Sequence, residues 1–398
     1  MDAGFGRELV YCEAAFFTFG PQALAERCHF CRDILELVSY HLIQKDLPSP
    51  LVTVAVANLN RKALLEACLH SLEAQRGVSF ELVVVDNAST DGSPEWVERY
   101  AQSAPFPVHL IRNTENLGFC TANNQGIAAA RGEFVALLNN DAEAEPGWLE
   151  QLLPAFSRGE DVGMAASKIL VWEDPSQIDK AGHLIWLDGQ NRGRGSGEID
   201  QGQYDAEEEV LWPDGAACMY RKAMLEEIGG FDEDLFAYGD DAELGLRARI
   251  AGWRCIYMPK AVVRHHRGTT LGLFSFRRVR LIERNRVLLA AKLFPGTLLW
   301  QNGLHYLARL AAGARAAVRG KGEIGRFPGW TAKFKALLAL LAGDLEAILM
   351  MPRTIAKRRG LKSLRRLSSS QVEQLLRSHT ISLKTLSESA VKGNAPRS

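Results

Sequence analysis

The chain has 398 residues, 47% of them hydrophobic, and its 47 basic and 47 acidic side chains cancel to a formal net charge of zero. This composition is typical of a globular protein of roughly two domains, and it excludes a collagen-like, wholly disordered or coiled-coil chain. Seven cysteines, a sparse and odd number, exclude a secreted disulfide scaffold and favour a reducing, cytoplasmic compartment.

The first part of the chain, residues 1–50, is an extension without a usable motif, and the run DLPSP at its end predicts a domain boundary. Strand-like and helix-like runs then alternate as far as residue 276. Continuous apolar strands separated by helices predict an α/β domain over residues 51–276, with a mostly parallel sheet covered by helices on both faces. The expected strands are 51–57, 81–85, 107–111 and 134–138, and the expected helices are 61–75, 95–102 and 120–131.

Residues 277–398 form a third, basic segment, with helical spacing in 302–318 and 331–350 and a Ser-rich tail that we expect to be mobile. The segment carries 24 basic and 6 acidic side chains, whereas the residues before it carry 23 basic and 41 acidic ones. This uneven distribution of charge predicts a polyanionic partner for the C-terminal segment, either nucleic acid or an anionic membrane surface. The nearest approach to a spanning segment, residues 336–351, is interrupted by Asp344 and Glu346.

Polar residues follow three of the expected strands, in residues 58–60, 86–93 and 139–141. Any one of these groups could simply form a turn, because Asn, Asp, Ser and Gly all favour turns. Three together predict a polar ligand at the carboxyl edge of the sheet, where open parallel sheets bind their ligands. An acidic residue ending the second strand suits a nucleotide's base or ribose, and one after the fourth suits a metal that holds a diphosphate. Neither the dinucleotide fingerprint nor the P-loop pattern is present, which argues against a dehydrogenase or a P-loop ATPase.

Four separated segments resemble, in order and spacing, the motifs of glycosyltransferase family 2, in its rhamnosyltransferase-like branch. The resemblance covers roughly residues 51–275 and implies a GT-A fold with a nucleotide-diphospho-sugar site. The segments are LVTVAVANLNRKALLEACLHSLEAQ, VVVDNASTDGS, RNTENLGFCTANNQGIAAARGEFVALLNNDAEAEPGWL and GGFDEDLFAYGDDAELGLRARIAGW.

The resemblance implies a set of donor and metal residues. The donor nucleotide would contact Asn58, Asp86, Gly118 and Asn123. A divalent metal, Mg²⁺ or Mn²⁺, would bind at the family's Asp-x-Asp position, which here reads Asn139-Asn140-Asp141. Asn139 replaces the first carboxylate and offers only a carbonyl oxygen. One of the two adjacent histidines, His265 or His266, would assist at the metal or the phosphates.

The resemblance also implies that Asp241 is the catalytic base, because the run from Tyr238 to Leu244 resembles the family's acidic motif before a helix. Inverting transfer needs one carboxylate to deprotonate the acceptor hydroxyl. Asp214 and Asp240 are candidates for contacts with the sugar or acceptor. Like-charge crowding of Asp240, Asp241 and Glu243 predicts that one of their pKa values is raised.

The function implied is transfer of a sugar, with rhamnose suggested by the branch, to a lipid-linked or polysaccharide acceptor in cell-surface glycan synthesis. A nucleotidyltransferase of similar fold and a degenerate module that only binds a sugar nucleotide remain as alternatives. The basic segment suits an anionic membrane better than nucleic acid, because no nucleic-acid-binding motif accompanies it. We therefore expect a cytoplasmic protein that is peripheral on the inner face of the cytoplasmic membrane. Its arginines could bind donor phosphates or an acceptor's diphosphate; they are Arg277, Arg278, Arg280, Arg284 and Arg286.

Overall fold

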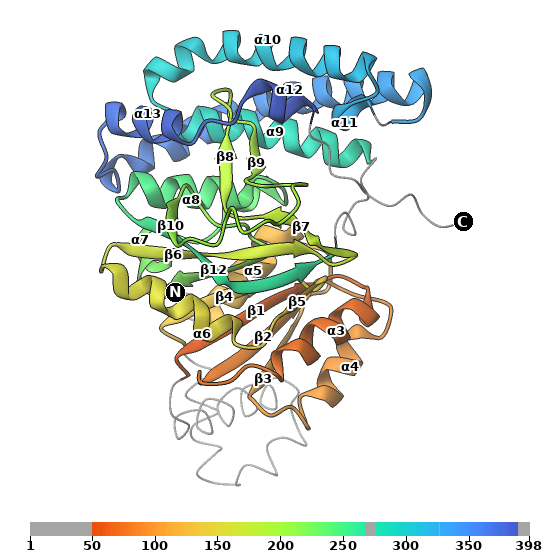
Figure 1. The fold of residues 1–398 in the computed structure, drawn as a ribbon, viewed down its shortest axis with the longest axis vertical. Coiled ribbons are helices and arrows are strands. Elements are labelled where there is room, and N and C mark those ends of the chain that lie inside the picture. Colours follow the sequence, from red (N-terminus) through yellow and green to blue (C-terminus); the bar gives the residue numbers. More distant parts are fainter. Residues whose placement is uncertain (1–49, 267–274, 326, 389–398) are drawn as a thin grey trace, which may run out of the picture. The chain divides into compact units, whose positions relative to one another are not determined.

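The structure, a computed structural model, describes residues 50–266, 275–325 and 327–388 (Figure 1). The chain from Pro50 onward forms one compact unit. The extension expected over residues 1–50 lies outside the described residues, apart from Pro50.

The first half of the central sheet is parallel, as the sequence predicts. Its strand order is β4-β1-β2-β3, and each strand pairs with its neighbour in the same direction. Burial of nearly every residue in β1, β2 and β4 explains their continuous apolar sequences. The strands are β1 Val52–Asn58, β2 Phe80–Asp86, β3 Val108–Arg112 and β4 Phe134–Leu138, joined by the helices α3 Lys62–Leu72, α4 Ser93–Tyr100 and α5 Gly118–Ala129.

The second half of the sheet is mixed. Strand β11 runs antiparallel between β4 and β6, while β12 is parallel to β6 and antiparallel to β5 and β10. A separate hairpin, β8-β9, projects from this half. The bounds are β5 Ala142–Ala144, β6 Val162–Val171, β7 Asp174–Lys180, β8 His183–Ile185, β9 Asn191–Gly193, β10 Glu208–Val210, β11 Ala217–Arg221 and β12 Arg254–His265.

Alternate residues of each strand pack into the two cores on opposite faces of the sheet. In β1, Val52, Val54 and Val56 join the core formed with α3, α4 and α6, whereas Ala55 joins the core formed with α5, α7 and α8. Helices therefore cover both faces, as expected. The additional elements are α6 Trp148–Leu152, the 3₁₀ turns η1 Leu153–Arg158 and η2 Glu233–Leu235, α7 Lys222–Ile228 and α8 Asp240–Ile250.

The basic segment is helical and packs together beyond α8 (Figure 1). The long helix α12 runs along α9, and Glu346 of α12 binds both Arg280 and Arg284 of α9, each at 2.7 Å. None of the helices in the described residues is both long and apolar enough to cross a membrane. The elements are α9 Phe276–Leu293, α10 Gly296–Val318, α11 Gly322–Gly325, α12 Gly329–Gly360, η3 Leu361–Ser363, α13 Ser369–Ser378 and α14 Leu383–Glu388.

The tail expected to be mobile contains two of these helices. The serines that suggested mobility include the N-cap of α13, where Ser368 and Gln371 form a reciprocal capping box. Val372 and Leu376 of α13 are buried against the β8 hairpin and α8. The buried apolar side of α13 and the capping box at its start thus hold this polar, Ser-rich sequence in a helix.

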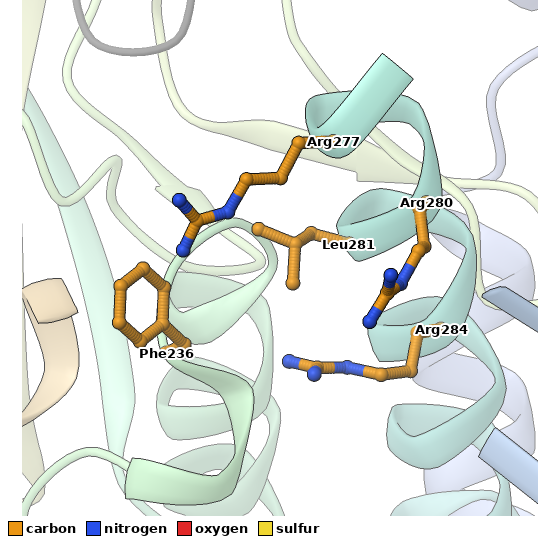
Figure 2. A pocket seen from close by; sticks show the side chains of 5 residues that line it. All are labelled: Phe236, Arg277, Arg280, Leu281 and Arg284. Carbon is orange, nitrogen blue, oxygen red and sulfur yellow. The ribbon is translucent and has the colours of Figure 1, made fainter. Parts of the chain in front are cut away.

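Two of the five arginines proposed for phosphate binding are buried in ion pairs. Arg284 pairs with Glu346, and Arg286 pairs with Glu283 at 2.6 Å. Arg277, Arg280 and Arg284 also line a cavity of about 240 Å³ together with Phe236 and Leu281 (Figure 2).

Candidate active site

The ends of β1 and β2 bring Asn58 and Asp86 together. The parallel register pairs these two residues directly, and Asn58 donates through Nδ2 to Asp86 Oδ2 at 2.9 Å. Asn140 donates to Asn58 Oδ1 at 2.7 Å, which ties the end of β4 to the same point. Asp86 also accepts from the backbone N–H of Ser89 at 2.8 Å. The result is a buried polar edge with a carboxylate at the carboxyl end of the sheet.

Gly118 and Asn123 lie on α5, beside this edge. Gly118 adopts φ +87°, and a Cβ there would lie 2.5 Å from the ring of Phe236, so close packing demands glycine at this position. The Gly118 carbonyl accepts from Asn87 Nδ2 at 3.1 Å. Asn123 is buried and donates to the carbonyl of Phe119 within its own helix at 2.9 Å. Gly118 is therefore tied to the residue after Asp86, whereas Asn123 bonds within its own helix.

Asp141 follows β4 and faces His265, because β5 and β12 pair in a register that places His265 opposite Ala142. His265 Nε2 lies 3.3 Å from Asp141 Oδ1, and its Nδ1 lies 2.8 Å from Asp179 Oδ2. Burial lowers the pKa of His265, but the two carboxylates outweigh it and raise that pKa to about 10. Arg61 Nη1 approaches Asp141 Oδ2 at 3.8 Å.

Asn139 and His266 are placed differently from their neighbours. The backbone N–H of Asn139 donates to the Ala216 carbonyl at 2.9 Å, which fixes the start of β11 beside the end of β4. His266 stacks on Trp172, with ring centroids 4.3 Å apart, and its Nε2 is 3.9 Å from Glu143. The two adjacent histidines therefore point to different partners, and His265 is the one that faces Asp141.

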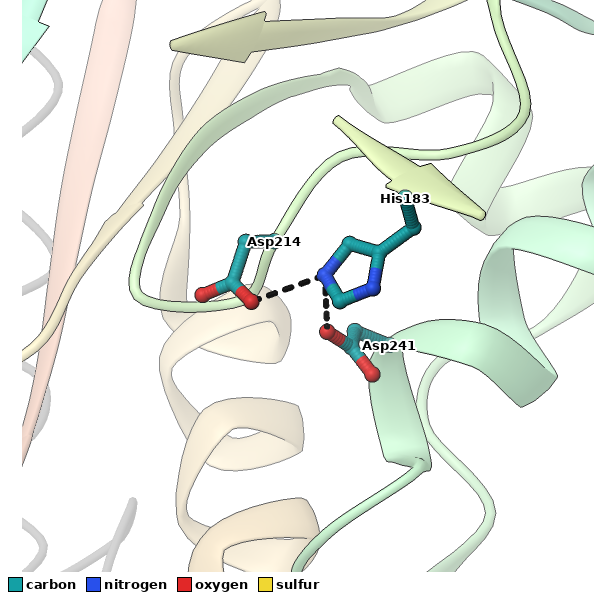
Figure 3. A group of neighbouring side chains, drawn as sticks. All are labelled: His183, Asp214 and Asp241. Atoms are coloured by element: carbon teal, nitrogen blue, oxygen red, sulfur yellow. Dashed lines mark hydrogen bonds and ion pairs between the residues drawn. The ribbon is translucent and has the colours of Figure 1, made fainter. Parts of the chain in front are cut away.

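A second cluster joins the candidate base to Asp214 through a histidine that the sequence analysis missed (Figure 3). His183 Nε2 lies 2.8 Å from Asp214 Oδ2 and 3.3 Å from Asp241 Oδ2. Burial lowers the pKa of His183, but Asp241 and Asp214 raise it to about 9. Lys180 also contacts this cluster, with its Nζ 2.5 Å from Asp214 Oδ2. Burial opposes ionisation of Asp214, yet Lys180 and His183 hold its pKa well below the usual range.

Asp240 and Glu243 have different surroundings although both are buried at the start of α8. Burial and the adjacent Asp241 carboxylate raise the pKa of Asp240, in agreement with the expected crowding. Burial also disfavours ionised Glu243, but Arg247 and Lys292 lower its pKa. Glu243 binds Arg247 at 2.9 Å and Lys292 at 2.7 Å, so it anchors α8 to α9.

Among the residues that the structure describes, two groups of side chains near the sheet edge have the chemistry to hold a divalent metal. The ligand atoms of His183, Asp214 and Asp241 lie within 4.8 Å of one another. Lys180 already neutralises part of that group at 2.5 Å. Asp141 and His265 offer a carboxylate oxygen and an imidazole nitrogen at the end of β4, a donor pair that suits Mn²⁺. Either group would have to give up the proton of its histidine to bind a metal, because the pKa of His265 is raised as well as that of His183. The Asp141 pair fits the metal better, because its cationic neighbour Arg61 is 3.8 Å from the carboxylate, whereas Lys180 is 2.5 Å from Asp214.

The two groups form one continuous cluster. Lys180 interacts electrostatically with Asp214, Asp179 and Asp241, and Asp179 is the residue bound to His265. Three members, Asp179, Lys180 and His183, come from one short segment, residues 178–186, that the sequence analysis passed over. Their signal was present, since they interrupt the apolar stretch from Ile178 to Trp186.

Comparisons with known proteins agree on one family. The model for "Glycosyl transferase family 2" matches residues 53–229. N-acetylglucosaminyl-diphospho-decaprenol L-rhamnosyltransferase of Mycobacterium tuberculosis is 32% identical over 224 residues, which cover 51% of this chain and 71% of that protein. The O-antigen biosynthesis protein RfbC of Myxococcus xanthus is 30% identical over 228 residues, 55% of this chain but only 17% of that longer protein.

Among solved structures, this chain is similar to the crystal structure of GalNAc-T7 with UDP, GalNAc and Mn²⁺. The TM-score is 0.50 at 15% identity, and the match covers 64% of this chain and 49% of that one. The expected GT-A fold, with its mostly parallel central sheet and a helical C-terminal region, is confirmed.

Proposed function

Because this chain belongs to glycosyl transferase family 2 and is a glycosyltransferase, we propose that it transfers a sugar with inversion from a nucleotide-diphospho-sugar to a lipid-linked acceptor in cell-surface glycan synthesis. The observation that carries the proposal is the continuous charged cluster from Asp141 to Asp241 at the carboxyl edge of the sheet. Rhamnose is the first sugar to test, because the M. tuberculosis relative is named a rhamnosyltransferase.

The donor would lie along the polar edge formed by Asn58 and Asp86. Their hydrogen bond holds the carboxylate in place for a ribose or base. Close packing of Phe236 on Gly118, together with the hydrogen bond from Asn87 to the Gly118 carbonyl, fixes the start of α5 beside this edge. Asp141 and His265 would hold Mg²⁺ or Mn²⁺. A bound metal would supply Lewis-acid stabilisation of the departing diphosphate.

Asp241 would take the proton from the acceptor hydroxyl. Its side chain is 14% exposed, so it can meet an acceptor, while Asp214 is fixed by Lys180 and His183. His183 bridges the two carboxylates and orients Asp241. Asp240 has a raised pKa and can donate a hydrogen bond to a sugar oxygen.

The basic segment would rest on an anionic membrane surface. Trp300 on α10 is 90% exposed and Trp330 on α12 is 78% exposed. Large apolar side chains recur at helical spacing along the outer side of α12, opposite the residues that pack on α9. Exposed apolar patches of this kind mark interaction surfaces, and interfacial tryptophans beside basic groups suit a lipid headgroup region. The side chains on α12 are Trp330, Phe334, Leu337, Leu338, Leu341, Leu345, Ile348 and Leu349.

A panel of sugar nucleotides with Mg²⁺ or Mn²⁺, including a deoxythymidine-diphospho-rhamnose donor, tests the proposal. The measured quantity is nucleoside diphosphate released with and without a short prenyl-diphospho-N-acetylglucosamine acceptor. Acceptor-stimulated release of nucleoside diphosphate supports the transferase. Release of pyrophosphate from a nucleoside triphosphate would support a nucleotidyltransferase instead, and donor binding without any release would support a module that only binds the donor.

A further inference from the structure

The cavity between η2 and α9 has an unusual lining of three guanidinium groups and two apolar side chains (Figure 2). Arg277 lies over the ring of Phe236, with 5.2 Å from its guanidinium carbon to the ring centroid. Arg280 and Arg284 enter from the next turns of α9. Figure 2 shows Leu281 between Arg277 and Arg284, on the same side of the helix.

The charge of this lining is positive after its internal ion pairs are counted. Glu346 binds both Arg280 and Arg284 at 2.7 Å, so one carboxylate serves two guanidinium groups. Arg284 also donates to the Leu235 carbonyl at 2.8 Å, which fixes its position. Arg277 and Arg280 are exposed. Fixed and exposed guanidinium groups in surplus over carboxylates favour binding of phosphate oxygens.

The cavity lies next to the candidate active site. Phe236 packs on Gly118, and its carbonyl accepts from the backbone N–H of Cys120 at 3.2 Å. Two residues further along the same loop, the ring of Tyr238 lies 5.7 Å from the guanidinium carbon of Arg278. Tyr238 interacts electrostatically with Asp240 and Asp141. One short loop therefore connects the cavity to the start of α8, which carries the candidate base Asp241, and to the candidate metal ligand Asp141.

The other side of the cavity is bounded by α12. Glu346 projects from this helix to the cavity, whereas Leu345, Ile348 and Leu349 beside it are 60%, 61% and 74% exposed. An amphiphile could thus place an anionic head between Arg277 and Arg280 while its chain follows the apolar outer side of α12. The volume of about 240 Å³ is below the roughly 300–1,000 Å³ of pockets for whole ligands, so it suits a phosphate group better than a complete sugar nucleotide.

We propose that this cavity binds the diphosphate of the lipid-linked acceptor and so sets the acceptor class as a prenyl-diphospho-sugar. The inference rests on the proposed function, because it assigns a substrate class to the same transferase. Arg277 and Arg280 bind the phosphate oxygens, Phe236 and Leu281 contact the first isoprene unit, and the sugar extends along the 236–241 loop towards Asp241.

Calorimetric titration with farnesyl diphosphate tests the site directly, with farnesol as the phosphate-free probe. Arg277→Gln should weaken farnesyl diphosphate binding about tenfold, the usual effect of losing one charge-assisted hydrogen bond. Arg280→Gln is a second variant at the same site. The matched control is Arg315→Gln, which removes the same charge from an exposed position of α10 outside the cavity. Farnesol binding should be equal in all four proteins.

Titration of the same proteins with a nucleoside diphosphate and Mn²⁺ distinguishes the acceptor from the donor as the source of phosphate. A selective loss of nucleoside diphosphate binding in Arg277→Gln would assign the cavity to the donor and overturn the proposal. Equal farnesyl diphosphate affinity in Arg277→Gln and Arg315→Gln, or no binding to the wild-type protein, would also overturn it. Acceptor-independent donor hydrolysis by the wild-type enzyme tests the proposed function separately, because that reaction needs no lipid diphosphate.

Discussion

Asp241 has two restraints that a free carboxylate would lack, the helix start at Asp240 and the bridging imidazole of His183. We predict that Asp241→Asn lowers the turnover rate about 10²–10⁴-fold, the usual loss when a general base is removed. Donor affinity should change little, because the proposed role of this carboxylate is to take a proton from the acceptor. Steady-state kinetics and donor titration measure the two effects. Asp205→Asn, at a 64% exposed side chain, is the control, and near-normal turnover in Asp241→Asn would remove Asp241 from this role.

Asp141 should act on the donor instead. We predict that Asp141→Ala abolishes the Mn²⁺-dependent part of donor binding, because this carboxylate holds the metal in the proposed site. The fold should be retained, because Asp141 lies outside the two hydrophobic cores that flank the sheet. Calorimetric titration with and without Mn²⁺ gives the difference, and circular dichroism checks the fold. Donor affinity that still responds fully to Mn²⁺ would place the metal elsewhere, with the His183, Asp214 and Asp241 group as the next site to examine.

Asp232, in the loop before η2, is one of the residues that fix helices α9 and α12 to the sheet-containing part of the chain. It binds Lys292 of α9 at 2.6 Å and also Lys357 of α12. Burial opposes its ionisation, but the two lysines lower its pKa to about 2. A carboxylate with a depressed pKa stabilises the fold above its unfolded pKa of about 3.9 and loses this contribution as the pH falls towards the folded value.

The expected result is a loss of about 2 kcal/mol of unfolding free energy in the wild-type protein between about pH 4 and pH 2. Asp232→Asn should be less stable at neutral pH and should lack this part of the acid dependence. Urea denaturation across the pH range measures both quantities, and Glu160→Gln, at an exposed acid, is the control. If the unfolding free energies of the wild type and Asp232→Asn fell equally as the pH was lowered, the stabilising role of ionised Asp232 would be contradicted.

At the level of elements, the parallel half of the fold could be predicted and the mixed half could not. β1, β2 and β4 are continuous apolar runs that alternate with amphipathic helices, so their positions follow from the sequence alone. β5, β8 and β10 have three residues each, which is too few for an alternating pattern to be detected. β5 and β10 form by pairing with the distant strand β12, and β8 forms a hairpin with β9. Asn58 and Asp86 could be anticipated as neighbours because parallel strands end at one edge, whereas His183 reaches Asp241 only through the tertiary placement of a hairpin.

The whole molecule presents basic charge and apolar side chains on the same helical segment. We predict binding to anionic vesicles with two components. The electrostatic part, about 1 kcal/mol for each engaged basic group, should weaken as salt shortens the Debye length from about 8 Å at physiological ionic strength. The apolar part should persist at high salt and should be lost in the double variant Trp300→Ser and Trp330→Ser.

Co-sedimentation with anionic and neutral vesicles across a salt series measures both components. Trp172→Ser is the control for loss of an exposed tryptophan, because Trp172 follows β6 and is 38% exposed. Equal binding to both vesicle types would contradict the electrostatic component, and high-salt binding unchanged by the double variant would contradict the apolar one. Salt-sensitive binding to nucleic acid without vesicle binding would identify the other polyanionic partner.

The strand that carries His183 is completed by residues almost two hundred positions later. Ile185 in β8 donates to the His379 carbonyl at 3.1 Å and accepts from the Ile381 backbone N–H at 3.0 Å. Ribosomes release a chain from its amino end, so domains generally begin to fold before synthesis is finished. A nascent chain could therefore assemble the donor edge at Asn58 and Asp86 early, but the hairpin holding His183 beside Asp241 lacks its partner until residue 381 has emerged. Premature termination upstream of that residue would leave the polar edge at Asn58 and Asp86 formed but the β8 strand without the backbone partners that complete it.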